Sequence, residues 1–202
     1  MAAKIDIKKQ YKHLFASKRE PHLVDVPEFR YMMIDGKGSP DGEAFQDAIG
    51  ALYSTAYTTK FRLKAAGRAD FVVPPLEALW WADEESAFDE NRRDEWQWTL
   101  MLIQPDHVSE EDIADALAAL DQKGKATASH RSMRAELLEE GQAVQCLYVG
   151  PYASMGGAIS TMQAFAESNG LELAGKHHDV YLSDPRRTAP KKLKTVLRRP
   201  VR

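Results

Sequence analysis

Residues 30–39 read Arg-Tyr-Met-Met-Ile-Asp-Gly-Lys-Gly-Ser, and residues 145–154 read Gln-Cys-Leu-Tyr-Val-Gly-Pro-Tyr-Ala-Ser. In each stretch an apolar run typical of a strand ends at a glycine-containing turn, and the two stretches lie 115 positions apart. A helix pattern and two further strand patterns follow each turn. The repeat predicts an α+β fold in which one βαββ unit occurs twice.

The first unit is predicted over about residues 21–105. Apolar and aromatic side chains recur at helical spacing from Phe45 to Leu63, and Gly67 closes the pattern. Apolar runs bounded by turn residues mark the strands before and after this helix. We expect these strands at 22–26, 29–35, 69–82 and 93–103.

The second unit is predicted over about residues 130–200. Ile159, Met162 and Phe165 mark one face of its helix. Apolar runs again precede and follow the helix. We expect the strands of this unit at 134–138, 143–149, 177–183 and 192–199.

Two further segments complete the predicted organisation. Residues 1–20 are expected to be an N-terminal helical extension. Residues 109–124 are expected to be a helix that connects the units, because Ser109 and Asp112 have capping-box spacing. Residues 21–202 are predicted to form a single domain, since two such units usually join their sheets.

Composition narrows the class of protein. The 202-residue chain is 44% hydrophobic and 28% charged, as in soluble globular proteins, and its net charge of -3 argues against general nucleic-acid binding. It has no apolar run of membrane-spanning length and no signal-peptide pattern, so we expect a cytoplasmic protein that does not bind membranes. The last 17 residues carry eight basic side chains, either a solvated strand face or a contact for an acidic partner.

All four tryptophans fall within 19 positions, as Trp80-Trp81 and Trp96-x-Trp98. We expect them on two antiparallel strands joined by an acidic loop at 83–94. Strand alternation places Glu77 and Trp81 on one face and Trp80 on the other. The rings are either core or walls of a cleft that contains the Glu77 carboxylate, since aromatic faces attract flat or cationic ligands.

Several segments resemble the GyrI-like small-molecule-binding family, above all its stand-alone members. They occur in the family's order and span about residues 20–200. The segments are 52–57 with Lys60, 75–81, 145–152, 177–185 and 190–198.

The resemblance implies two SHS2 modules of βαββ topology related by a pseudo-twofold axis, with antiparallel sheets, helices on one side and a ligand cleft on the other. It also implies a cleft lined by aromatic residues around an acidic group. Asp179 matches the family's cleft carboxylate, and Glu77 is its expected counterpart in the first module. The family commonly has Glu at 179 and often His at 148. The residues expected to bind ligand are Tyr53, Tyr57, Glu77, Trp81, Trp98, Tyr148, Asp179 and Tyr181.

The expected function is binding of bulky aromatic or cationic small molecules such as xenobiotics, with protection by sequestration. Two alternatives stay open: a hydrolase that opens the cyclopropane of DNA-alkylating natural products, and a protein-interaction role such as gyrase inhibition. In an enzyme, Glu77 is the expected general acid or base. A monomer or weak dimer without a cofactor is expected.

Two other residue types argue for structural roles. His177 and His178 alternate to opposite strand faces and cannot hold one metal ion together, so no metal site is expected. Cys146 lies in an apolar run and is expected to be a small core residue. Tyr53 and Tyr57 lie one helical turn apart on the first long helix, and Lys60 continues the same stripe. These tyrosines are either core or part of the cleft wall.

Overall fold

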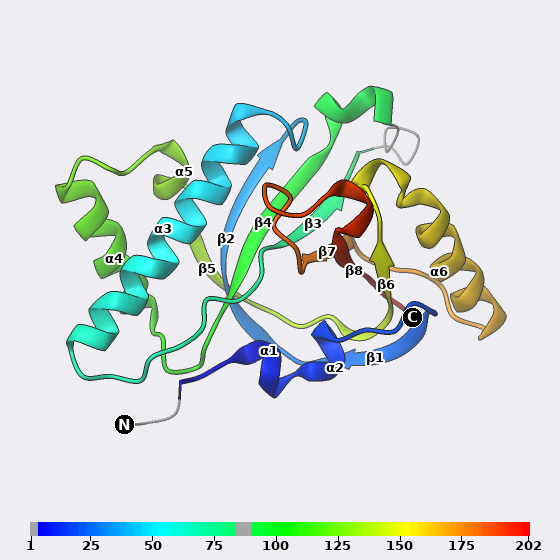
Figure 1. Ribbon diagram of the computed structural model, residues 1–202, viewed down its shortest axis with the longest axis horizontal. Coiled ribbons are helices and arrows are strands. Elements are labelled where there is room, and N and C mark those ends of the chain that lie inside the picture. Colours follow the sequence, from blue (N-terminus) through cyan, green and yellow to red (C-terminus); the bar gives the residue numbers. More distant parts are fainter. Residues whose placement is uncertain (1–3, 84–89) are drawn as a thin grey trace.

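The computed structural model describes residues 4–83 and 90–202. Its described strands form one antiparallel sheet in the order β1-β6-β8-β7-β3-β4-β2-β5 (Figure 1). The predicted α+β class is therefore confirmed. The strands are β1 (His22–Val26), β2 (Phe29–Lys37), β3 (Glu77–Trp81), β4 (Gln97–Gln104), β5 (Arg134–Leu138), β6 (Gly141–Val149), β7 (His177–Tyr181) and β8 (Lys194–Pro200).

The predicted duplication is present as two βαββ units. The first is β2, α3 (Glu43–Ala65), β3 and β4, and the second is β6, α6 (Gly156–Ser168), β7 and β8. The units meet edge to edge, because β3 pairs with β7 in the middle of the sheet. The strand that precedes each unit crosses to the other one: β1 pairs with β6, and β5 with β2. This exchange ties the units into one sheet.

The connecting segment contains two helices. α4 (Glu110–Gln122) begins with the predicted capping box, in which Ser109 and Asp112 bond each other's backbone N–H groups. A second, unpredicted helix follows, α5 (Ala128–Arg131). Both helices pack beside α3 on the first unit.

Two predicted strands are shorter in the structure. The strand expected at 69–82 contains only β3, because Pro74 and Pro75 have no N–H to donate to a sheet. The strand expected at 93–103 begins at Gln97, after a 3₁₀ helix, η2 (Glu90–Glu95). Part of the expected acidic loop lies outside the described residues.

One face of the sheet carries α3 and α6. Leu52 and Ala56 of α3 pack on Met32 and Leu100 of the first unit. Met162 and Ala166 of α6 pack on the second unit, with Cys146 beneath them. Burial of Cys146 raises the pKa of its thiol to about 11, so this residue is core, as expected. Figure 1 shows both helices on the same side of the sheet, with central strands visible between them.

The opposite face carries the N-terminal helices α1 (Ile7–Gln10) and α2 (Lys12–Phe15). Leu14 and Phe15 belong to an apolar cluster with Tyr31 of the first unit and Val196 of the second. The N-terminal extension is helical, as predicted from the sequence. It packs on both units.

Among the residues that the structure describes, no helix is long and apolar enough to cross a membrane.

Candidate functional site

The register of the central pair decides which side chains share a face. Ala78 lies opposite Asp179, and Leu79 opposite His178. Directly opposed residues of antiparallel strands point to the same side of the sheet. Asp179 therefore lies on the α3–α6 face and Glu77 on the face covered by α1 and α2. The prediction that Glu77 and Asp179 share one cleft is wrong, because Ala78 and not Glu77 lies opposite Asp179.

Asp179 lies at the centre of a hydrogen-bonded aromatic group. Trp80 Nε1 donates to the Tyr181 hydroxyl over 3.1 Å, and this hydroxyl donates to Asp179 Oδ2 over 3.3 Å. His177 Nε2 lies 3.0 Å from Asp179 Oδ1. The Tyr152 ring meets Tyr181 edge to face at 5.7 Å. We call these five residues the inter-helix site.

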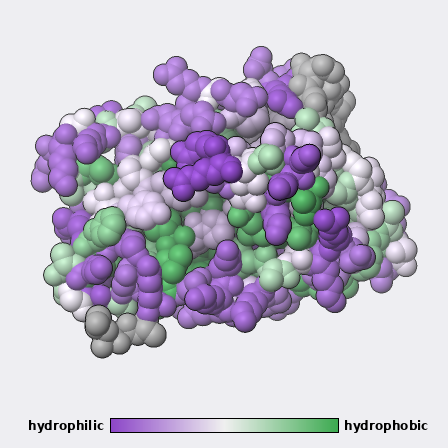
Figure 2. All heavy atoms as spheres, viewed as in Figure 1, coloured by the Kyte–Doolittle hydropathy of each residue, from purple (hydrophilic) through white to green (hydrophobic). Residues whose placement is uncertain are grey.

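Partly exposed rings lie on the same side of the sheet as the buried carboxylate. Asp179 is only 2% exposed, whereas Tyr152 at its side is 36% exposed. On α3, Tyr53 stacks with Tyr57 at 6.4 Å, and Tyr57 is 46% exposed. Figure 2 shows apolar atoms in the middle of this face with hydrophilic side chains around them. The surface offers aromatic contact above a buried negative group.

The tyrosines of the site keep their protons over the physiological range. Burial and the nearby Asp179 and Asp184 carboxylates raise the pKa of Tyr152 to about 12. Burial, followed by Asp179, raises the pKa of Tyr181 well above its usual value. Burial likewise raises the pKa of Tyr53. Neutral phenols can donate hydrogen bonds to Asp179 and to a ligand.

Tyr148 lies on the same face, at its edge. It pairs across the sheet with Thr195, which pairs in turn with Tyr181. Its hydroxyl donates to the Pro151 carbonyl over 2.9 Å, and a Cβ at Gly150 would lie 2.5 Å from that hydroxyl. Tyr148 therefore supports the turn before α6.

Two of the tryptophans lie away from the site. Trp98 is 1% exposed and packs edge to face on Phe45, and a Cβ at Gly36 would lie 2.1 Å from its ring. Trp98 is thus core, and its expected place in a cleft wall is wrong. Trp81 lies on the opposite face, where the Lys176 ammonium is 3.2 Å from its ring centre. Trp80 is the tryptophan that donates a hydrogen bond within the inter-helix site, to the Tyr181 hydroxyl.

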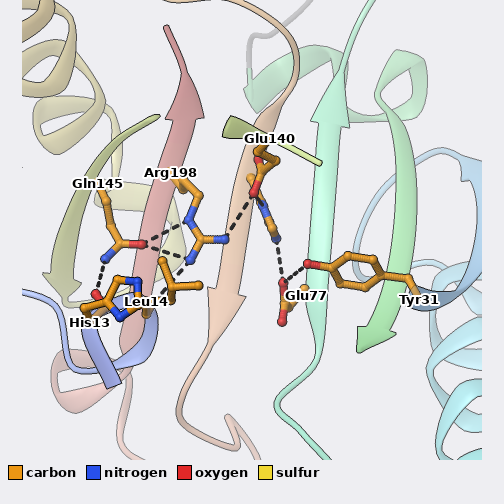
Figure 3. Close-up of polar contacts among 8 residues, drawn as sticks. His13, Leu14, Tyr31, Glu77, Glu140, Gln145 and Arg198 are labelled. Atoms are coloured by element: carbon orange, nitrogen blue, oxygen red, sulfur yellow. Dashed lines mark hydrogen bonds and ion pairs between the residues drawn. The ribbon is translucent and has the colours of Figure 1, made fainter. Parts of the chain in front are cut away.

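Glu77 belongs to a buried charge network on the opposite face (Figure 3). Its Oε2 accepts from the Tyr31 hydroxyl over 3.3 Å and lies 2.9 Å from His178 Nε2. His178 Nδ1 lies 2.9 Å from Glu140, and Glu140 lies 3.1 Å from Arg198 Nη1. Glu77 is 1% exposed. We call this set the Glu77 network.

His178 and Glu140 of this network are held in their charged forms. Burial opposes a positive imidazole, but hydrogen bonding and attraction to Glu140 and Glu77 outweigh it and raise the pKa of His178 to about 9. Burial also opposes the Glu140 carboxylate, yet His178 and Arg198 lower its pKa to about 2. Charges are therefore paired inside the protein, as buried ionic groups require.

The network also fastens the N-terminal extension. Arg198 Nη2 donates to the Leu14 carbonyl over 3.2 Å, and Gln145 Nε2 donates to the His13 carbonyl over 3.0 Å. Arg198 is 2% exposed, so the interpretation of it as part of a solvated basic tail is wrong. Arg198 is therefore buried and does not offer a surface contact to a protein partner such as gyrase.

The comparisons with known proteins agree with this fold. Residues 19–202 match the GyrI-like small molecule binding domain. The chain belongs to this family. The family is one of small-molecule-binding domains, and the aromatic surface above Asp179 is a candidate place for such a molecule.

Solved structures include near relatives. An uncharacterized conserved protein from Listeria innocua is 42% identical, with a TM-score of 0.92 over 98% of this chain and 100% of that one. A hydrolase from Listeria innocua is also 42% identical, with a TM-score of 0.91 over 99% of this chain and 100% of that one. The EcmrR C-terminal domain is 14% identical over 91% of this chain and 97% of that one, with a TM-score of 0.56, and shares the fold. No match was found among functionally curated proteins.

For this GyrI-like chain, sequence reasoning missed two residues of the inter-helix site, His177 and Tyr152, and misplaced Lys60. His177 shares a strand face with Asp179 and Tyr181, which alternation alone could have indicated. Tyr152 follows the Gly150-Pro151 turn and gave no periodic signal. Lys60 was expected to continue the tyrosine stripe, but it is 8% exposed and pairs with Asp70, so that expectation is wrong.

Proposed function

We propose that this GyrI-like protein binds flat aromatic small molecules at the inter-helix site. The observation that carries the proposal is a buried carboxylate beneath partly exposed aromatic rings. Stacking on Tyr152 and Tyr53 supplies apolar contact, and the Asp179 carboxyl group supplies a polar anchor beneath them. Such a surface suits ligands with several fused or linked rings.

The charge at the site favours cationic members of this class. Among the ion pairs of residues 4–83 and 90–202, the only partner of Asp179 is His177, which is charged only when protonated. Glu140, on the other face, contacts both His178 and Arg198. Because Asp179 lacks a permanent cation, a positive group on the ligand would complete its environment.

A second candidate function is hydrolysis of the bound molecule. The full-length Listeria innocua relative at 42% identity is a hydrolase. The hydrogen bond between His177 and Asp179 supplies groups that exchange protons with water. The substrate class that we propose is an aromatic alkylator with a cyclopropane ring, to which water is added.

Two probes test binding and turnover in one experiment. Ethidium serves as the polycyclic aromatic cation, and an aryl-substituted spirocyclopropylcyclohexadienone serves as the strained electrophile. We expect both probes to quench tryptophan fluorescence, because the Trp80 indole is hydrogen-bonded to Tyr181 and so lies within the proposed binding site. Chromatography of the second mixture reports whether ring-opened product exceeds one equivalent of protein.

A matched pair of variants locates the binding surface. Tyr152→Ala removes a half-buried ring at the site, whereas Leu23→Ala removes an exposed apolar side chain on β1. We expect Tyr152→Ala to weaken binding of both probes by at least tenfold and Leu23→Ala to leave it unchanged. Equal affinity in both variants would place the ligand elsewhere. Quenching without product would leave a binding and sequestering protein.

A further inference from the structure

His177 is a buried histidine with one ring nitrogen unused. The residue is 6% exposed, and its Nε2 contacts Asp179. In the part of the chain that the structure describes, its Nδ1 has no hydrogen-bond partner. The next residue, His178, uses both nitrogens, on Glu77 and Glu140. A buried polar atom without a partner is uncommon in proteins, and a water or a bound molecule can supply the missing partner.

The hydrogen bonds around Asp179 determine which nitrogen of His177 carries the hydrogen. An indole N–H only donates, so Trp80 occupies the acceptor side of the Tyr181 hydroxyl. The single hydroxyl hydrogen of Tyr181 then goes to Asp179 Oδ2. With Asp179 as the acceptor of this contact, His177 donates from Nε2 to Oδ1. In neutral imidazole this leaves Nδ1 as a free acceptor.

We propose that His177 is the proton acceptor of the inter-helix site and that Asp179 is the residue that positions it. The inference rests on the hydrolysis proposed above. Asp179 fixes the ring and its tautomer, and Nδ1 receives a proton from the water that attacks the bound molecule. Asp179 thereby acts through His177, and Tyr181 acts through Asp179.

The step balances for a spirocyclopropylcyclohexadienone. The water oxygen forms a bond to a cyclopropane methylene carbon, and one proton of that water passes to His177 Nδ1. The carbon–carbon bond to the spiro centre breaks, and its electron pair aromatises the ring to a phenolate. The imidazolium returns its proton to the phenolate oxygen. The product is a hydroxyethyl phenol, which contains the substrate plus one water.

The charged groups around His177 favour this role. Asp179 and Tyr181 flank it on β7, and Trp80 lies opposite it on β3. Tyr152, from the segment before α6, packs on the Tyr181 ring. Lys176 precedes His177 in the chain, but its ammonium lies over Trp81 on the other face of the sheet. A negative carboxylate is therefore the charged group in direct contact with the imidazole, and it stabilises the imidazolium formed during reaction.

Two amide variants separate the two nitrogens. His177→Gln places an amide near the Nε2 position and can still donate to Asp179, but it removes the acceptor at Nδ1. His177→Asn places an amide near Nδ1 and gives up the contact with Asp179. His22→Gln, on β1, is the control. For each variant we would measure the dissociation constant of the probe by fluorescence and kcat by chromatography.

We expect His177→Gln to bind the probe within about twofold of the unsubstituted protein and to lower kcat by roughly 10²–10⁴-fold, as for loss of a general base. His22→Gln should change neither value. Nitrogen NMR of the ring should show hydrogen on Nε2 and none on Nδ1, and the Nδ1 signal should shift when the probe binds.

Failure of the proposed role of His177 and failure of the proposed hydrolysis give different results. If the unsubstituted protein opens the ring and His177→Gln retains its kcat, the role of His177 is wrong and the hydrolysis stands. If the unsubstituted protein binds the probe and yields no product, the hydrolysis is wrong and the role of His177 falls with it. A neutral ring with hydrogen on Nδ1 would overturn the proposal even if both variants failed to fold.

Discussion

The two faces of the central β3–β7 pair each place a histidine beside a carboxylate, yet they differ in what remains unpaired. On the covered face, His178 contacts Glu77 and Glu140, and Arg198 completes the charge balance. On the α3–α6 face, His177 has only Asp179, and the described residues leave its Nδ1 without a partner. Adjacent residues in one strand thus serve different purposes.

The difference shows how a fold separates stability from binding. The covered face lies under α1 and α2, so its charges must be paired within the chain. The other face has partly exposed rings at Tyr57 and Tyr152, so a molecule from solution can approach it. The buried histidine of the covered face uses both ring nitrogens, whereas the histidine of the other face leaves one nitrogen for a molecule from solution.

The largest effect is expected on the covered face. Arg198→Met removes the cation that contacts Glu140, Gln145 and the Leu14 carbonyl. Loss of one partner of a buried ion pair costs about 3–5 kcal/mol, so the free energy of unfolding should fall by this amount in urea titrations. Arg202→Met, in an exposed pair with Glu172, is the control and should leave the midpoint unchanged. Equal midpoints for the two variants would contradict a stabilising Glu77 network.

The second effect is the pH dependence of stability. The pKa of His178 rises from an ordinary value near 6.5 to about 9 in the folded protein. A raised pKa contributes stability that is fully present below pH 6.5 and is lost as the pH rises through 9. We expect the free energy of unfolding to fall on the order of 2–3 kcal/mol between pH 6.5 and 9.5, from the size of this shift. A flat profile in urea titrations across this range would show that His178 is neutral.

A smaller effect is expected at the inter-helix site. Tyr181→Phe removes the hydroxyl that joins Trp80 to Asp179. We expect ethidium to bind about tenfold more weakly, which corresponds to about 1.4 kcal/mol. Tyr148→Phe removes a hydroxyl on the same face that bonds Pro151 instead, and it should leave the dissociation constant unchanged. If Tyr148→Phe weakened ethidium binding more than Tyr181→Phe does, the ligand would lie nearer to α6 than we propose.

The smallest effect is expected at Trp81. Because Trp81 lies on the covered face under Lys176, Trp81→Phe should leave the dissociation constant for ethidium within about twofold, below 0.5 kcal/mol. Trp80→Phe should weaken binding more, since it removes the donor to Tyr181. Fluorescence anisotropy of ethidium measures both. A larger loss in Trp81→Phe would return the site to the face predicted from the sequence.

Much of the fold could be predicted because its signals are local. The 3.6-residue rhythm gave α3, and the capping box gave the start of α4. Apolar runs between turn residues gave every strand, with errors at the ends. The repeat then gave the duplicated topology, although not the exchange of β1 and β5, which depends on pairing between distant segments.

The candidate site was harder to predict because it depends on register. Alternation along a strand places Asp179 and Tyr181 on one face, and the two side chains are hydrogen-bonded in the structure. It cannot say whether Glu77 or Ala78 lies opposite Asp179, and a shift of one residue sends a carboxylate to the other side. Glu140 follows β5 in a short turn, where no periodicity marks a buried partner for His178.

The central claim is that the ligand lies over Asp179 and not over Glu77. The most direct measurement is ethidium binding to Asp179→Asn and Glu77→Gln, each first shown to be folded by circular dichroism. We predict that Asp179→Asn loses at least tenfold in affinity and that folded Glu77→Gln binds as the unsubstituted protein does. Normal binding by Asp179→Asn together with loss of binding in folded Glu77→Gln would contradict the account.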